Sequence, residues 1–145
     1  MNQKNSTYHI PVLCHACIEG LDMNPHGTYV DVTFGGGGHS RAIFDRLSSK
    51  GTLYAVDQDE DAKRNVWDAP NFHFIQSNFS FIQNQLKLRG VSKVDGILAD
   101  LGVSSHQFDE GDRGFSIRND GALDMRMNAS ANRNAADVLN NYEEE

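Results

Sequence analysis

The sequence has few cysteines, no long apolar run and few basic residues. Its only cysteines are Cys14 and Cys17, and without a second pair they favour a reducing compartment over a disulfide framework. No stretch approaches the length of a membrane span, and the first residues, MNQKNSTYHI, lack the apolar segment of a secretory signal. We therefore expect a cytoplasmic protein with no membrane partner.

The shortage of positive charge limits the possible functions. Thirteen lysines and arginines stand against 20 acidic residues, which gives a formal net charge of −7. That balance argues against wholesale electrostatic capture of nucleic acid, although it allows a local basic surface. Hydrophobic residues make up 39% of the 145-residue chain, which is a low share for a self-sufficient globular unit, and the length suits one domain.

Short apolar runs alternate with segments of helical periodicity along the chain. Strands are predicted at 28–34, 52–57, 71–76 and 94–100. Helices are predicted at 12–22, 40–47, 60–67 and 79–88, with a last helical stretch at 131–145. Strands that alternate with helices are typical of βαβ units, so we expect an α/β fold with a parallel sheet. The expected strand order is 3-2-1-4.

Four consecutive glycines, Gly35–Gly38, follow the first predicted strand in the segment VDVTFGGGGHS. Their backbone entropy is too costly for a helix or an ordinary strand, so we expect a ligand to approach the main chain here. In an open parallel sheet this loop lies at the crevice where ligands bind. A P-loop lysine is absent, and Ser40 and Arg41 occupy the positions where a dinucleotide fingerprint needs its third glycine. A tight turn without a ligand is the alternative.

Two aspartates suggest which ligand this is. Asp57 ends the second predicted strand about twenty residues beyond the glycines, where a carboxylate commonly binds the ribose hydroxyls of a nucleotide. Asp31 lies in the first strand, near enough to its end to meet a cationic group. A ligand with a ribose and an ammonium group but no pyrophosphate is S-adenosyl-L-methionine, which we expect as the cofactor. Asp57 alone would equally suit a solvated turn.

Several blocks of the sequence resemble the MraW/RsmH family of methyltransferases, which modify the N4 amine of a cytosine in small-subunit ribosomal RNA. The blocks are HIPVL (9–13), DVTFGGGGHS (31–40), DQDEDA (57–62), VDGILADLGVSS (94–105), Gln107 and RGFSIRNDGALDMRMN (113–128). The resemblance covers nearly the whole chain, and DLGVSS and DMRM are more specific than a generic cofactor loop. It implies a Rossmann-like class I methyltransferase fold with ribosomal RNA as the partner.

The resemblance also implies which residues form the site. Its cofactor contacts fall on Gly37, Gly38, His39, Asp57, Phe79, Asp100 and Gln107. Asp100 is the candidate catalytic residue, because an acceptor for the amine N–H would free the delocalised lone pair of an exocyclic cytosine amine. The alternative is an aspartate that caps a turn at the end of a strand. No metal site is expected, because Cys14 and Cys17 form one pair only and should face the core.

The segment after Asp100 has many turn residues and is long for a loop without a function. The resemblance implies that residues 1–105 are the N-terminal half of the cofactor domain and that 106–145 begin an inserted substrate-recognition module. Phe108 and Phe115 could stack on a base while arginines meet phosphates. In the alternative interpretation the phenylalanines anchor the loop. The arginines concerned are Arg113, Arg118 and Arg126, and their alternative partners are Asp109, Asp112 and Asp124.

Members of the family are roughly twice as long as this chain, so we expect a sheet truncated after its fourth strand. Two other functions stay open: a cofactor-binding fragment without catalytic activity, and half of a nicotinamide-dependent oxidoreductase, which the missing third glycine disfavours. The fourth strand would then be an apolar edge that carries Val94, Ile97, Leu98 and Ala99. Such an edge invites pairing with a second copy, so a homodimer is expected, either by antiparallel pairing of this strand or by swapping of the segment after Asp100.

Overall fold

The computed structural model describes residues 11 and 13–143 of the chain. Its elements, in chain order, are α1 (Cys14–Gly20), β1 (Thr28–Asp31), α2 (Gly38–Phe44), β2 (Thr52–Asp57), the 3₁₀ helix η1 (Glu60–Asn65), β3 (Phe72–Gln76), η2 (Phe79–Phe81), α3 (Ile82–Lys87), β4 (Gly96–Leu98), α4 (Ser105–Asp109), η3 (Gly111–Arg113) and α5 (Ala135–Asn141). Strands and helices alternate up to β4, as predicted.

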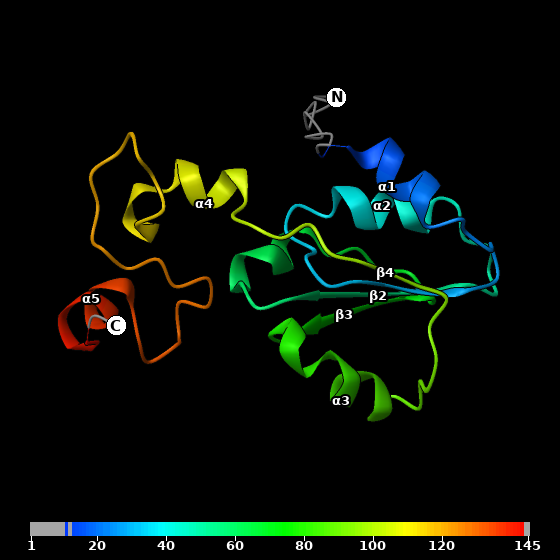
Figure 1. The fold of residues 1–145 in the computed structure, drawn as a ribbon. Helices are drawn as coiled ribbons and strands as arrows, with labels where there is room; N and C mark the ends of the chain where they lie inside the picture. Colours follow the sequence, from blue (N-terminus) through cyan, green and yellow to red (C-terminus); the bar gives the residue numbers. More distant parts are fainter. Residues whose placement is uncertain (1–10, 12, 144–145) are drawn as a thin grey trace.

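The four strands form one parallel sheet in the order β3-β2-β1-β4. At its centre, Val30 of β1 lies opposite Tyr54 of β2 and Ile97 of β4. Helices α1 and α2 cover one face of the sheet and α3 covers the other (Figure 1). The predicted order and the parallel sheet are therefore confirmed, and the fold is a Rossmann-like α/β fold whose sheet has four strands in the described residues.

The core lies on both faces of the sheet because successive side chains of a strand point to opposite sides. In β2, Leu53 and Ala55 pack in the cluster that faces α1 and α2, whereas Val56 packs on the α3 side. Ile43 of α2 belongs to the first cluster, and Leu86 of α3 belongs to the second. Burial on both faces explains why these strands read as continuous apolar runs and not as alternating ones.

Helix α1 begins at Cys14 and not at residue 12 as predicted, and the apolar residues at its start, Leu13 and Ala16, do not face the core. Leu13 has a left-handed φ of 56° and caps the helix from outside, so its side chain is 71% exposed. Ala16 is exposed as well, and Val12 lies outside the described residues. The side chains packed on the core are Cys14, Cys17, Ile18 and Leu21. They follow the helical spacing from Cys14, and the prediction that both cysteines face the core is confirmed.

The first and fourth strands along the chain are shorter than predicted. The first strand ends at Asp31 and not at residue 34, although the N–H groups of Val32 and Phe34 still donate to the carbonyls of Leu98 in β4 and Val56 in β2. The fourth strand covers Gly96–Leu98 instead of 94–100. Because a strand can pair only along the length of its neighbour, the short β1 limits β4.

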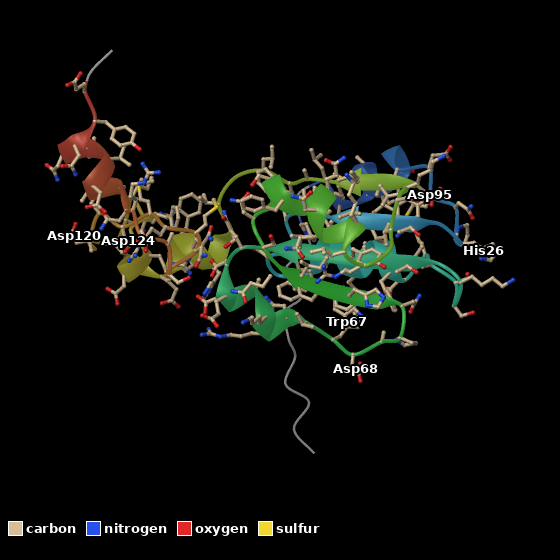
Figure 2. All side chains as sticks on the ribbon, turned by 90° about the horizontal axis from the view of Figure 1, so that it is seen from below. His26, Trp67, Asp68, Asp95, Asp120 and Asp124 are labelled. Carbon is tan, nitrogen blue, oxygen red and sulfur yellow. The ribbon has the colours of Figure 1, made fainter. Side chains whose placement is uncertain are left out.

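Beyond β4 the chain passes the carboxyl end of the sheet and forms α4, η3 and α5, which lie together past the ends of the strands (Figure 1). In Figure 2 the labelled Asp120 and Asp124 mark this segment, and Asp95 and His26 lie on the sheet side. The predicted last helix is confirmed only as α5, Ala135–Asn141. The segment therefore follows the sheet at the edge where a parallel α/β fold binds ligands.

Candidate functional site

A cavity of about 1260 Å³ opens at the carboxyl ends of the strands. Its wall is built from the glycine loop after β1, the ends of β2 and β3, and the segment between β4 and α4. Of the residues predicted for the site, those on this wall are Gly38, His39, Asp57, Phe79, Asp100 and Gln107. Asp31 and Gly37 are not among the lining residues. Six of the eight residues predicted for the site therefore line this cavity.

The glycines of the loop have different surroundings. Gly36 lines the cavity, and no atom lies within 4 Å of the position that a Cβ would take. Gly37 has a φ of 78°, and its Cβ would lie 3.1 Å from the ring of Phe34. Gly37 is therefore required by the turn itself, since other residues rarely adopt this φ, whereas Gly36 leaves open space on the cavity side.

Asp57 connects the loop to the end of β2. Its Oδ2 accepts the N–H of Gly35 at 2.7 Å and its Oδ1 accepts the N–H of Asp59 at 2.9 Å. Burial raises the pKa of Asp57, and these N–H bonds offset the rise only in part. Because a carboxylate has about four lone-pair sites, both oxygens can still accept a further hydrogen bond from a ligand in the cavity.

Asp31 is the last residue of β1 and is fully buried. Its Oδ2 accepts the hydroxyl of Ser40 at 2.6 Å, and its Oδ1 accepts the N–H of Thr33 at 3.0 Å. Burial raises the pKa of Asp31 more than these bonds lower it. The alternation of β1 gives the reason for its place: Asp31 points to the same face as Tyr29, toward α2, where Ser40 meets it.

His39 and Asp100 both line the cavity, and their side chains lie close together. His39 Nδ1 lies 3.8 Å from Asp100 Oδ2; the histidine side chain is 6% exposed and that of the aspartate is 62% exposed. The main-chain N–H of Asp100 donates to Thr33 Oγ1 at 2.8 Å, which fixes the backbone of Asp100 to the end of β1. The backbone of Asp100 is therefore held in place, and its carboxylate is exposed on the cavity wall.

Phe79 and Gln107 occupy the wall in different ways. Phe79 is 43% exposed, so its ring offers an apolar surface to the cavity. Gln107 is buried, its Oε1 accepts the N–H of Ser104 at 3.0 Å, and its Nε2 donates to Asp59 Oδ2 at 2.8 Å. Both ends of the Gln107 side chain are thus bound within the protein.

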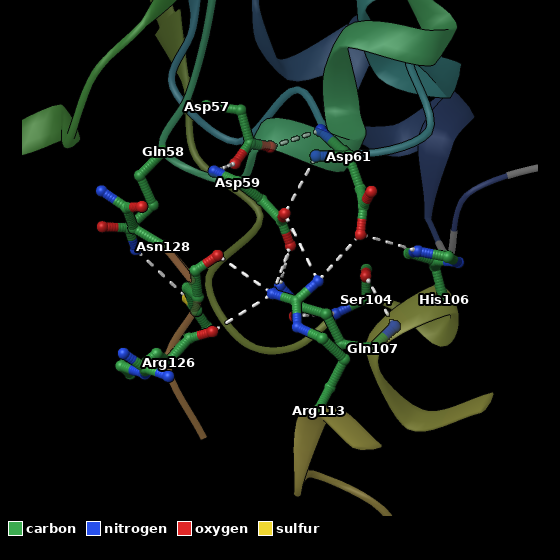
Figure 3. A network of polar contacts seen from close by, with 12 residues as sticks. Asp57, Gln58, Asp59, Asp61, Ser104, His106, Gln107, Arg113, Arg126 and Asn128 are labelled. Carbon is green, nitrogen blue, oxygen red and sulfur yellow. Dashed lines mark hydrogen bonds and ion pairs between the residues drawn. The ribbon is translucent and has the colours of Figure 1, made fainter. Parts of the chain in front are cut away.

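Arg113 forms a network that the sequence did not reveal (Figure 3). Its guanidinium donates to Asp59 Oδ2 at 2.8 Å and to Asp61 Oδ2 at 3.0 Å. It also donates to the carbonyls of Arg126 and Met127, at 3.1 and 3.0 Å. Burial raises the pKa of Asp59, but the hydrogen bonds from Arg113 and Gln107 outweigh it and hold that pKa below its usual value. One side chain therefore joins the segment after β4 to the end of β2.

The other aromatic and basic side chains of this segment follow the anchoring interpretation in part. Phe115 is buried, as expected for an anchor, whereas Phe108 is 42% exposed. Arg126 pairs with Asp124 at 2.6 Å, as that interpretation predicted. Arg113 pairs with Asp59 and Asp61 instead of the nearby aspartates, and Arg118 is exposed.

Two amides on the cavity wall were also missed. Asn78 Nδ2 donates to Gln58 Oε1 at 2.8 Å, and Gln58 Nε2 contacts Met127 Sδ at 3.3 Å. Both follow the ends of strands, and polar residues at that position are the signal that could have found them. Among residues 11 and 13–143 there is no group of three His, Cys, Asp or Glu side chains placed to hold a metal ion. In the same residues no helix has the length and apolar character needed to cross a membrane.

A parallel sheet, a glycine loop after its first strand and a carboxylate at the end of its second are typical of α/β proteins that bind a nucleoside or nucleotide cofactor. Residues 6–145 match the model of the MraW methylase family, and the chain belongs to that family. The resemblance that the sequence blocks indicated is thereby confirmed.

Curated relatives of the chain are named ribosomal RNA small subunit methyltransferase H. The relative from Porphyromonas gingivalis is 61% identical over 141 residues, which are 97% of this chain and 45% of the relative. The relative from Parabacteroides distasonis is 59% identical over 143 residues, which are 98% of this chain and 47% of the relative. The relative from Bacteroides thetaiotaomicron is 57% identical over 145 residues, which are 100% of this chain and 48% of the relative. The chain thus spans about half the length of the curated relatives it matches.

Proposed function

We propose that this chain carries the cofactor site of an S-adenosyl-L-methionine-dependent methyltransferase that acts on small-subunit ribosomal RNA. The target is the N4 amine of a cytosine, and the protein works in the cytoplasm. The observation that carries the proposal is the Asp57 carboxylate, which lies on the cavity wall beside the glycine loop and keeps lone pairs for a ligand. The family and the names of the relatives support the reaction class.

The residues of the cavity fit this cofactor. Asp57 would accept the two ribose hydroxyls, and the open space at Gly36 would admit the ligand against the main chain. The half-exposed ring of Phe79 would lie against the purine. His39 Nε2 is buried and has no hydrogen-bond partner among the described residues, so a residue of this wall has an unused capacity for a hydrogen bond. When bound, the cofactor supplies an electrophilic methyl group.

Asp100 is proposed as the catalytic residue. Its backbone is held by Thr33, and its carboxylate is exposed on the cavity wall. In that place the carboxylate would accept a hydrogen bond from the N–H of the target amine and leave the nitrogen lone pair free to attack. The nitrogen becomes positively charged when it gains the methyl group, so its proton then leaves readily to Asp100 or to water. Most of the acceleration would come from alignment of the reacting atoms.

We also propose that residues 106–145 begin a module that recognises the RNA. The network of Arg113 supports this arrangement, because it places that segment beside the cavity. A second candidate function is a cofactor-binding unit without catalytic activity of its own, which the coverage of about half of each relative favours. A second copy of the chain is a further proposed partner.

Titration calorimetry on the 145-residue chain tests the cofactor. S-adenosyl-L-methionine and S-adenosylhomocysteine should both bind, and NAD should not; preferential binding of NAD would favour the oxidoreductase alternative. Incubation of the protein with small ribosomal subunits and labelled cofactor tests the reaction, with mass spectrometry of the RNA fragments to locate the methyl group. Cofactor binding with no methylated cytosine would leave the binding-unit alternative in place of the enzyme.

A further inference from the structure

His39 is a buried histidine with one ring nitrogen near a carboxylate and the other near no partner. It is the second residue of α2, its side chain is 6% exposed, and its Nδ1 lies 3.8 Å from Asp100 Oδ2. Its Nε2 is buried and has no hydrogen-bond partner in the described part of the chain. The two nitrogens therefore stand in different environments, and the proton of a neutral ring has a preferred site.

A proton on Nε2 would be a buried donor without an acceptor, which is costly. A proton on Nδ1 would point to the carboxylate of Asp100 and leave Nε2 as an acceptor only. Asp31 lies close enough to interact electrostatically with His39, but its Oδ1 is bound by Thr33 and its Oδ2 by Ser40. The carboxylate that lies 3.8 Å from Nδ1 is that of Asp100, and in the described residues no ion pair joins His39 to Asp31.

The separation of 3.8 Å is longer than a hydrogen bond, which needs about 2.7–3.2 Å between N and O. The histidine is fixed by burial, whereas the carboxylate of Asp100 is 62% exposed and its main chain is held by Thr33 at 2.8 Å. A hydrogen bond between the two groups therefore requires the exposed side chain of Asp100 to rotate toward the buried ring.

We propose that His39 is a positioning residue for Asp100: its Nδ1–H holds one carboxylate oxygen and leaves the other directed at the cavity. A carboxylate that accepts a hydrogen bond from one amine N–H lowers the activation barrier more if it is already held in one orientation. A mobile carboxylate would lose conformational entropy in every reaction cycle. The role in catalysis rests on the proposed function, whereas the pairing of His39 with Asp100 is a property of the protein alone.

The first test is nitrogen-15 NMR of the histidine rings in the protein without ligand. The His39 ring should show a protonated Nδ1 and an unprotonated Nε2, and Asp100→Asn should shift the Nδ1 resonance and speed its proton exchange. His73, which is exposed and stacks on Tyr54, serves as the reference ring and should not respond. A proton on Nε2, or no response to Asp100→Asn, would overturn the proposal.

The second test separates positioning from cofactor contact. His39→Phe keeps a flat ring and removes the donor, whereas His39→Asn puts an amide N–H near the position of Nδ1. At saturating cofactor, His39→Phe should lower kcat by about tenfold, because Asp100 loses the hydrogen bond that holds it in one orientation. His39→Asn should restore most of the rate. Loss of cofactor affinity with kcat preserved would make His39 a cofactor contact and contradict the proposal.

A double-mutant cycle closes the argument. If His39 acts through Asp100, the variant that combines His39→Phe with Asp100→Asn should have the same kcat as Asp100→Asn alone. Additive losses would show that the two residues act separately. If the unmodified protein methylates no ribosomal RNA, the proposed function fails, and the NMR result still decides whether the pair exists.

Discussion

A single carboxylate, that of Asp57, both holds the glycine loop and faces the cavity. Its two oxygens bind the N–H groups of Gly35 and Asp59, so the loop after β1 is tied to the end of β2 by the group that would bind the ribose. The cost is burial, which raises the pKa of Asp57. At the scale of single residues, the shape of the site and its capacity to bind a ligand therefore depend on the same atoms.

The first prediction concerns that carboxylate. Asp57→Ala should weaken S-adenosylhomocysteine binding at least about tenfold, because two charge-assisted hydrogen bonds at roughly 1.5–3 kcal/mol each are lost. Asp68→Ala is the matched control, since Asp68 is exposed and lies away from the cavity wall (Figure 2). Calorimetry gives both dissociation constants. An unchanged value for Asp57→Ala would remove this residue from the cofactor site.

The second prediction compares two neighbouring glycines. A methyl group at Gly36 enters open space beside the cavity, so Gly36→Ala should weaken cofactor binding and leave the melting temperature almost unchanged. Gly37→Ala should lower stability by about 1–2 kcal/mol, because the left-handed φ of 78° is unfavourable for alanine and the methyl meets Phe34. Thermal melts and calorimetry on both variants separate the two effects. If Gly36→Ala binds normally, the loop is only a turn at that position.

At the scale of elements, the loops at the strand ends are joined by one arginine. Arg113 of η3 reaches both carboxylates that follow β2 and two carbonyls further along the segment. An arginine can do this because its planar group has five N–H donors. The partners Asp59 and Arg113 have side chains only 11% and 15% exposed, so neither is well solvated if the other is lost.

The third prediction follows from that burial. Arg113→Leu should destabilise the protein by about 3 kcal/mol, since it leaves the Asp59 carboxylate buried and without a counter-charge. Limited proteolysis should then cut first within residues 106–127. Arg118→Leu is the control, because Arg118 is exposed in the same segment. Equal urea midpoints for Arg113→Leu and the unmodified protein would show that the network contributes nothing to stability.

The fourth prediction is the response of this network to acid. The folded pKa of Asp59 lies below its unfolded value of about 3.9, so its ionised form is favoured by folding. That stability is fully present above the unfolded pKa and is lost as the pH falls through the folded pKa. The free energy of unfolding should therefore decrease below about pH 4. In Asp59→Asn this part of the acid response should disappear, and an identical pH profile would contradict the assignment.

The sequence predicted the elements better than their ends and their contacts. β2 matches its predicted range, residues 52–57, because an apolar run between turn residues is read locally. The helix expected at 60–67 is the 3₁₀ helix Glu60–Asn65, a difference that periodicity does not resolve. The pairing of Arg113 with Asp59 joins residues 54 positions apart. Such a contact follows from the tertiary arrangement and leaves no local pattern.

The candidate site shows the same limit. Asp57 is the last residue of β2 and Asp100 follows β4, and the rule that parallel strands end at one edge places both on the cavity wall. Asp31 also belongs to a strand, but it points sideways to Ser40. The difference is the direction of one side chain in an alternating strand, which depends on which face α2 covers. A sequence argument that stops at strand ends does not resolve it.

At the scale of the whole molecule, β4 is an edge of the sheet. It pairs with β1 on one side, and no strand pairs with its other side in the described residues. Leu98 is buried, whereas Ile97 is 53% exposed. An apolar edge with free N–H and C=O groups is a template for another strand.

The last prediction is that the 145-residue chain self-associates through this edge, by antiparallel pairing of β4 about a two-fold axis. Light scattering across a dilution series should show a dimer that dissociates toward the 16.1 kDa monomer. Ile97→Lys should give the monomer throughout, because a charged side chain on an edge strand opposes pairing. Leu88→Lys is the matched control, since Leu88 is 81% exposed but lies at the end of α3. A monomer at every concentration would show that the exposed edge is not sufficient for association.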